Sequence, residues 1–313
     1  MARELDPQAQ AVLDLLDSVP RPPTHALSVT SARSALEEFF TDEDPDPVGD
    51  VADFSIPGPE TDIPVRLYLP EAEGPHPALV YLHGGGWVLG GLDTHDATCR
   101  GIVTRADCAV LSVDYRLAPE HPFPAALEDS YAAVEWTVEN GERVDIDTDR
   151  VAVGGDSAGG NLTAGVTLMA RDHGGPDVAH QVLLYPAVAS PLVHDFESYE
   201  ENGEGYFLET ESMRWFYERY ITRATDQRNE YAAPLLAADL SGLPPATVVT
   251  AEFDPLRDEG REYGDRLGDA GVPVTHHHYD GMIHGFSSME EFVDAAGESL
   301  DDVANDLQET FSS

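Results

Sequence analysis

The chain has 313 residues, of which 59 are aspartate or glutamate and only 17 are basic, all of them arginine, giving a formal net charge of -42. This charge repels nucleic acids and anionic membrane surfaces at long range and excludes them as partners. A disordered acidic segment is excluded as well, because 42% of the residues are hydrophobic and the acids are spread along the chain.

An acid excess without any lysine is typical of halophilic proteins, whose surface charges repel one another until molar salt screens them. The Debye length falls from ~8 Å at physiological salt to ~3 Å at 1 M. Repulsion is then strongest within clusters such as Asp42-Glu43-Asp44 and Glu200-Glu201. We therefore interpret the chain as halophilic, with an ordinary acidic mesophilic protein as the alternative.

Residues 5–16 predict a first helix, because Asp6 can cap it, Pro7 suits its first position and apolar residues recur on one face. A second helix is expected over 31–40, before an acidic, proline-rich link over 42–47. The N-terminus carries no apolar stretch of signal-peptide length, and no window approaches 18 apolar residues. We therefore expect a cytoplasmic protein that does not span a membrane.

From about residue 50, short apolar runs alternate with longer helical patterns, which favours an α/β fold with a mostly parallel sheet flanked by helices. The expected strands are 63–69, 78–82, 109–113, 151–154, 182–185, 246–250 and 272–279. The expected helices between them are 94–105, 125–140, 158–172 and 258–270. An acidic, aromatic segment over 190–228 interrupts this alternation and is interpreted as an insertion, helical in its second half.

The run Gly155-Asp156-Ser157-Ala158-Gly159 follows an expected strand and opens a helical pattern. A serine on a sharp strand-to-helix turn is a nucleophile elbow, in which flanking glycines permit the tight turn. The N-terminus of the following helix directs free N–H groups at developing negative charge. The alternative is a glycine-rich turn with an uninvolved serine.

The run His83-Gly84-Gly85-Gly86-Trp87 directly follows the strand expected over 78–82. Three consecutive glycines allow the backbone to turn its N–H groups into a concavity, as an oxyanion hole requires. The alternatives are a flexible linker and a phosphate-binding loop. The loop lacks the G-K-[ST] ending of a P-loop and the G-x-G-x-x-G spacing.

A serine needs a base to accept its proton, and the base needs an orienting acid. His284 follows the last expected strand between glycines, in a loop that can bring an imidazole over the sheet edge. Asp254 follows the strand expected over 246–250 and is the favoured acid. Glu252 and Asp258 are its rivals, and Asp258 is expected to cap the next helix instead.

Other residues of metal-ligand type are interpreted as structural. Cys99 and Cys108 are expected to be buried free thiols, with a disulfide or metal pair as the alternative. The run His276-His277-His278 would place its outer two imidazoles on one side of a strand, without a nearby carboxylate or cysteine pattern, which makes a poor zinc site. His121 lies among prolines in a loop and is expected to be scaffold.

With these residues on the page, the chain resembles the hormone-sensitive lipase-like (family IV) carboxylesterases. The resemblance is carried in order by 83–87, 114–125, 155–161, 254–258 and 281–286 and covers nearly the whole chain. It implies an α/β-hydrolase fold with a helical cap, a Ser157–His284–Asp254 triad and an oxyanion hole formed by the N–H groups of Gly85, Gly86 and Ala158.

In that family the cap is built from an N-terminal segment and an insertion. Here these would be residues 1–45 and 190–225, on a catalytic domain formed by 46–189 and 226–313. Several apolar residues are then expected either to line an acyl pocket or simply to hold the cap on the core. They are Trp87, Tyr185, Tyr206, Phe207, Leu208, Met213 and Phe216.

The resulting hypothesis is a serine carboxylesterase for short- to medium-chain esters, adapted to high salt, that needs no cofactor and no metal. Its expected partner is a small ester substrate, and a homodimer is left open. An amidase or aryl-acyl deacetylase with the same triad is the alternative, followed by a non-catalytic small-molecule receptor. A dehalogenase or epoxide hydrolase would require aspartate at position 157.

Overall fold

Eight strands form one mixed sheet in the order β1-β2-β4-β3-β5-β6-β7-β8 in the computed structural model, which describes residues 4–18, 22–40 and 46–312. β2 runs antiparallel to both of its neighbours, and the strands from β4 to β8 are parallel. The strands are β1 Asp50–Ile56, β2 Ile63–Leu69, β3 His76–Leu82, β4 Ala109–Val113, β5 Ile146–Asp156, β6 Gln181–Leu184, β7 Ala246–Phe253 and β8 Val274–Ile283.

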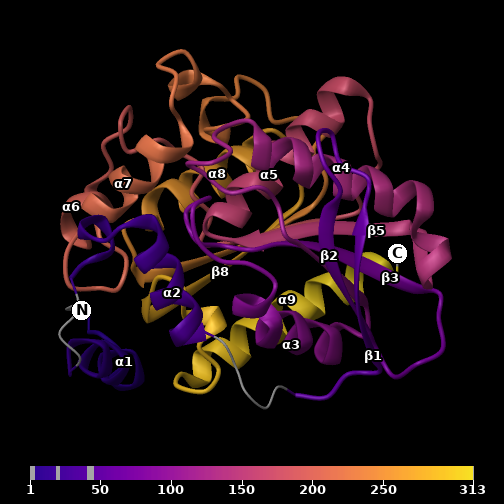
Figure 1. Cartoon of the computed structure of the whole chain (residues 1–313), viewed down its shortest axis with the longest axis horizontal. Coiled ribbons are helices and arrows are strands. Elements are labelled where there is room, and N and C mark those ends of the chain that lie inside the picture. The colour runs from indigo at the N-terminus through magenta and orange to yellow at the C-terminus, as the bar shows by residue number, and fades with distance from the viewer. Residues whose placement is uncertain (1–3, 19–21, 41–45, 313) are drawn as a thin grey trace.

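Helices cover both faces of this sheet, which confirms the expected α/β class (Figure 1). α4, α5 and α8 lie on one face, and α3 and α9 lie on the other, each over a buried apolar cluster. The α-helices are α1 Pro7–Ser18, α2 Val29–Phe40, α3 Asp96–Ala106, α4 Ala125–Asn140, α5 Ala158–His173, α6 Glu197–Glu201, α7 Thr210–Tyr220, α8 Arg257–Asp269 and α9 Asp294–Phe311.

All seven expected strands are present, and the two that extend furthest toward the site are longer than predicted. β7 continues to Phe253 and β8 to Ile283, so Asp254 and His284 each follow directly on the last residue of a strand. The carboxyl ends of parallel strands share one edge of a sheet, which is where ligands bind in open α/β sheets. These extensions therefore bring the two side chains to the edge reached by Ser157 after β5.

α1 and α2 lie on the same side of the molecule as α6 and α7, which belong to the inserted segment (Figure 1). Asp6 caps α1 as expected, because its carboxylate accepts the N–H of Gln8 at 2.7 Å. Residues 42–45 of the acidic link, including Asp42-Glu43-Asp44, lie outside the described residues. The division into cap and catalytic domain stays a prediction.

Cys99 and Cys108 are buried and free, as expected; Cys99 lies on α3 and Cys108 directly precedes β4. Burial raises the pKa of Cys108 to about 12, so its thiol stays protonated. Within the described ranges, the helices are too short or too polar to cross a lipid bilayer.

Candidate active site

Ser157 occupies a strained backbone conformation between β5 and α5. Its φ of 54° and ψ of -111° are rarely adopted by a residue with a side chain. The turn is held by two backbone hydrogen bonds, from Ser157 N–H to Leu184 O at 2.8 Å and from Ala187 N–H to Ser157 O at 3.1 Å. The elbow predicted from the sequence is therefore present as a strand-to-helix turn.

The elbow fits against β3 because glycines lie two residues before and two residues after the serine. A Cβ on Gly159 would lie 1.7 Å from the carbonyl oxygen of Leu82, and one on Gly155 would lie 2.1 Å from the same atom. Both contacts involve backbone, which cannot move aside cheaply. The glycines of the motif are thus explained by close packing of the turn against the neighbouring strand.

Three side chains predicted from different parts of the sequence form one hydrogen-bonded chain. His284 Nε2 lies 3.0 Å from Ser157 Oγ, and His284 Nδ1 lies 2.8 Å from Asp254 Oδ2. Because the carboxylate can only accept, Nδ1 carries a proton and Nε2 is free to accept one from the serine. Asp254 is fully buried, and its other oxygen accepts the N–H of Leu256 at 2.8 Å.

The two rival acids lie elsewhere. Glu252 contacts His278 and two arginines, and Asp258 pairs with Arg257. The prediction that Asp258 caps α8 is wrong: the helix begins at Arg257, and the carboxylate accepts the N–H of Ser198 at 2.9 Å instead. Asp258 is already the second residue of α8, so it stands inside the helix rather than at its cap.

The triple-glycine loop borders the same cavity as Ser157 and Ala158. Gly85 and Gly86 have φ of 108° and 61°, and a Cβ on Gly86 would lie 2.3 Å from the ring of Phe216. Ala158 is the first residue of α5, so its N–H is one of those that the helix leaves without an internal partner. The geometry therefore places the three predicted donors around one concavity beside the serine.

A buried acid beside the serine anchors the glycine loop. Asp156 Oδ1 accepts the hydroxyl of Tyr81 and the N–H of Gly84, both at 2.9 Å, and lies 3.2 Å from His95 Nε2. Burial alone would raise the pKa of Asp156, but His95, followed by the Tyr81 hydroxyl and His83, holds this pKa below its usual value. Sequence reasoning missed this role, although an acid in an apolar strand needs partners when it is buried.

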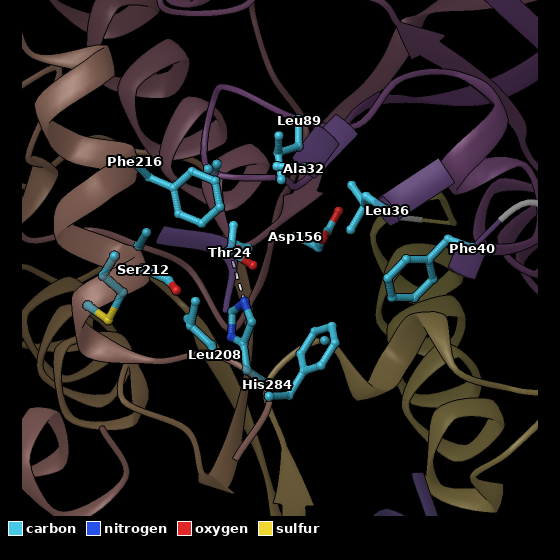
Figure 2. A pocket seen from close by; sticks show the side chains of 18 of the residues that line it. Thr24, Ala32, Leu36, Phe40, Leu89, Asp156, Leu208, Ser212, Phe216 and His284 are labelled. Atoms are coloured by element: carbon cyan, nitrogen blue, oxygen red, sulfur yellow. Dashed lines mark hydrogen bonds between the residues drawn. The ribbon is translucent and has the colours of Figure 1, made fainter. Parts of the chain in front are cut away.

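The cavity beside Ser157 has a volume of about 250 Å³ and a largely apolar wall. In Figure 2, Leu208 and Phe216 lie on one side of His284, and Leu36 and Phe40 lie on the other. The described wall includes five predicted pocket residues and others from α1 and α2. The five are Trp87, Phe207, Leu208, Met213 and Phe216.

The placement of Tyr185 and Tyr206 in the pocket is corrected by the structure. The Tyr185 ring packs edge-on against the His284 imidazole, with 4.9 Å between the ring centroids, and is not part of the described cavity wall. Tyr206 packs against the ring of Phe253 instead. The N-terminal wall was missed: Leu36, Phe39 and Phe40 line the cavity from α2. Two adjacent phenylalanines at the end of an amphipathic helix were the available signal.

His83 and His121 lie outside the hydrogen-bonded chain of Ser157, His284 and Asp254. Burial, with a smaller contribution from His95, lowers the pKa of His83 to about 3, and the neutral ring stacks on Tyr115 at 4.2 Å. His121 is exposed on the surface.

The expectation of no carboxylate near the triple histidine is wrong. His278 Nε2 lies 2.9 Å from Glu252 Oε2 and 3.5 Å from Asp280 Oδ1. Arg261 Nη2 lies 2.7 Å from the same nitrogen, so a guanidinium already occupies the position that a cation would take. The strand extension of β7 to Phe253 brings Glu252 to this place.

Comparisons with known proteins agree with this geometry. A family described as having the alpha/beta hydrolase fold matches residues 79–288. The chain is 47% identical over 250 residues to the carboxylic ester hydrolase LipN of Mycobacterium tuberculosis, in a match that covers 77% of this chain and 65% of LipN. It is 41% identical over 296 residues to the esterase LipI of that organism, covering 92% of this chain and 90% of LipI.

A solved structure shares nearly the whole fold. The ester-hydrolase EH1AB1 from the metagenome of Lake Arreo, complexed with a derivative of bipyridine phosphonate, is 42% identical with a TM-score of 0.94. The match covers 99% of this chain and 100% of that chain. The chain therefore belongs to the family of α/β-hydrolase fold proteins that matches residues 79–288, in agreement with its resemblance to the hormone-sensitive lipase-like carboxylesterases.

Proposed function

We propose that this carboxylic ester hydrolase cleaves short- to medium-chain esters through an acyl-enzyme formed on Ser157. The observation that carries the proposal is the hydrogen-bonded chain from Ser157 through His284 to Asp254, which opens on an apolar cavity. Chains of this kind activate a hydroxyl for attack on a carbonyl.

In the first step, Ser157 Oγ attacks the ester carbonyl carbon while His284 Nε2 takes the serine proton. The N–H groups of Gly85, Gly86 and Ala158 stabilise the negative oxygen of the tetrahedral intermediate. His284 then gives its proton to the alkoxide as the C–O bond breaks and the alcohol leaves. Asp254 keeps the imidazole in the tautomer that has its lone pair toward the serine.

In the second step, water attacks the acyl-enzyme while His284 Nε2 takes a proton from it. The oxyanion is held by the same three N–H groups. His284 then returns the proton to Ser157 Oγ, and the carboxylic acid is released. The steps balance without a cofactor or a metal, and the same residues serve both halves of the reaction.

The apolar cavity supports an acyl chain of short to medium length. Its volume of about 250 Å³ and its wall of phenylalanine, leucine and methionine offer burial to alkyl groups. An amidase with the same triad is the alternative; comparing the turnover of matched aryl esters and anilides separates the two. Residues 1–45 and 190–225 are proposed as the cap over this cavity.

The surface is proposed to be adapted to high salt, since the chain has 59 acidic residues and only 17 basic ones, all arginine. A cytoplasmic location and a homodimer remain predictions from the sequence.

The direct test replaces the nucleophile. Ser157→Ala is expected to lower kcat/KM for p-nitrophenyl esters, from acetate to octanoate, by about 10⁴-fold or more. An aryl phosphonate should add mass to the wild-type protein at Ser157 and add none to the variant. Ser130→Ala is the matched control, because this buried serine on α4 hydrogen-bonds within its helix. Turnover by Ser157→Ala near that of the control would refute the proposal.

A further inference from the structure

The backbone that carries Asp254 lies where regular sheet pairing fails. β7 and β8 pair in register up to Ala251, and the register then shifts, so that the next pair is Phe253 with Ile283. Asp254 follows directly. Its carboxylate is fixed by His284 and by the N–H of Leu256, and its backbone carbonyl accepts the N–H of Arg257 at 3.1 Å from within the same loop.

One side chain of the inserted segment supplies hydrogen bonds at this point. Asn202 follows α6 and is 1% exposed. Its Nδ2 group donates to Glu252 O at 3.1 Å and to Asp254 O at 2.9 Å. The amide therefore binds the two carbonyls that flank Phe253, one of which belongs to Asp254 itself. Arg257 Nη1 adds a longer contact to the Glu252 carbonyl, at 3.4 Å.

The rest of α6 contacts the next few residues of the same loop. Ser198 Oγ donates to Pro255 O at 2.6 Å, and Arg257 Nη2 donates to Glu201 Oε2 at 3.0 Å. The Ser198 N–H meets Asp258 on the first turn of α8. α6 thus follows the loop from Glu252 to Asp258, with Asn202 at the end nearest to the triad.

From this arrangement we infer that Asn202 is a positioning residue for the reaction. Its two hydrogen bonds hold the backbone of Asp254 where the carboxylate orients His284. The inference rests on the proposed role of Asp254. An asparagine amide carries two N–H donors in a fixed plane, so it can bind two carbonyls together. A shift of the orienting acid by about 1 Å is enough to lower the rate by about 10²-fold.

The test is a double-mutant cycle between Asn202→Ala and Asp254→Asn, measured with an activated aryl ester. Asn202→Ala should lower kcat by about 10-fold or more and leave KM within about twofold, because it acts on orientation rather than on the cavity wall. In the Asp254→Asn background the same substitution should cost less than about twofold, since its target has already been lost. Equal losses of kcat in both backgrounds would overturn the inference.

Two further variants separate positioning from folding. Asn202→Leu fills a similar space but has no N–H donors. If Asn202→Ala does not fold, Asn202→Leu takes its place in the test and should show the same loss of kcat. Gln181→Ala removes a buried amide that donates to Pro244 O at 2.9 Å, at the opposite edge of the sheet. It should lower the melting temperature and leave kcat and KM near wild type.

The two hypotheses fail differently. If Asp254→Asn keeps wild-type turnover, the triad assignment itself is wrong. If Asp254→Asn lowers turnover strongly while Asn202→Ala and Asn202→Leu keep kcat within about twofold of wild type, only the role of Asn202 is overturned.

Discussion

Glu259 is a buried carboxyl that the chemistry does not use. It lies on α8 with no exposed surface, where it accepts the N–H of Ala189 at 3.0 Å and a short hydrogen bond from the Tyr199 hydroxyl. Burial raises the pKa of Glu259 to about 8, although both hydrogen bonds act in the opposite direction. The side chain therefore joins the inserted segment to α8 as a neutral acid over most of the physiological range.

Glu259→Gln is expected to become more stable relative to wild type as the pH rises. Above pH ~4.5 the unfolded carboxyl ionises while the folded one stays protonated, so wild-type stability falls until about pH 8. Between pH 5 and 7, the free energy of unfolding of the variant should therefore rise by ~2 kcal/mol relative to that of the wild type. Urea unfolding in molar KCl measures it. Glu262→Gln, an exposed neighbour, is the control, and a pH-independent difference would contradict the raised pKa.

The sequence predicted the residues of the hydrogen-bonded chain more accurately than the residues of the cavity wall. Ser157, Asp254 and His284 could be predicted because each follows a strand and strand ends meet at one edge. Tyr185 was misplaced because its direction depends on a backbone with a φ of 35°, which no sequence pattern reveals. Asn202 was missed because an asparagine in an acidic, polar stretch looks like a surface residue, and only the packing of α6 buries it.

Helix α9 is tied to β8 by one imidazole held between two carboxylates. His277 Nδ1 lies 3.1 Å from Asp302 Oδ2, and Nε2 lies 3.0 Å from Asp306 Oδ2. The two acids are one turn apart on α9. The hydrogen bond to Asp306, followed by partial burial in the opposite direction, leaves the pKa of His277 above its usual value.

His277→Gln should therefore lower the free energy of unfolding at acidic pH, where the imidazole is charged, but not at alkaline pH. A raised pKa means that the charged form adds stability below pH ~6.5 and that this gain is lost as the pH rises through the folded-state pKa. Because the ring is 21% exposed and Asp302 is more exposed still, solvent screens the pair. The difference in the free energy of unfolding between pH 5.5 and 8.5 should be only ~0.5 kcal/mol. This difference should shrink in molar salt, which screens the charges. A larger loss at pH 8.5 than at pH 5.5 would contradict the charge pairing.

Elements with a strong apolar pattern were predictable, and those without one were not. β4 and α4 have the expected bounds. β4 is buried at every residue, and α4 is buried along one side, so both have a clear apolar pattern in the sequence. β1 was missed because it is an edge strand with Asp50, Asp53 and Ser55 and a mostly exposed surface. α6 has only five residues, too few for a helical period to show in the sequence.

The charge of the whole molecule is distributed unevenly between the cavity and the surface. The described cavity wall holds few ionisable groups, whereas α6 and α7 carry several exposed acids. The N-terminal helices contact the rest of the molecule partly through an ion pair, in which Arg33 Nη2 on α2 lies 2.7 Å from Glu120 Oε2. Unscreened repulsion at low salt should therefore act first on the helices around the cavity.

Dilution from 3 M to 0.1 M KCl is expected to abolish ester hydrolysis before the far-ultraviolet circular dichroism signal falls. The segments proposed as the cap should loosen while the sheet and its covering helices persist. Activity and dichroism are followed on the same samples, and restoration of salt should restore turnover after the first stage. Simultaneous loss of both signals would mean that the acids act on the entire fold, and unchanged activity at 0.1 M would contradict the halophilic interpretation.

Part of the cavity wall and the proposed base lie far apart in the chain. Leu36 and Phe40 precede Ser157, and His284 follows the serine by 127 residues. Chains emerge from the ribosome N-terminal part first. A nascent chain therefore contains Leu36, Phe40 and the serine before it contains the proposed base, and hydrolysis through the proposed triad can begin only after His284 has been added.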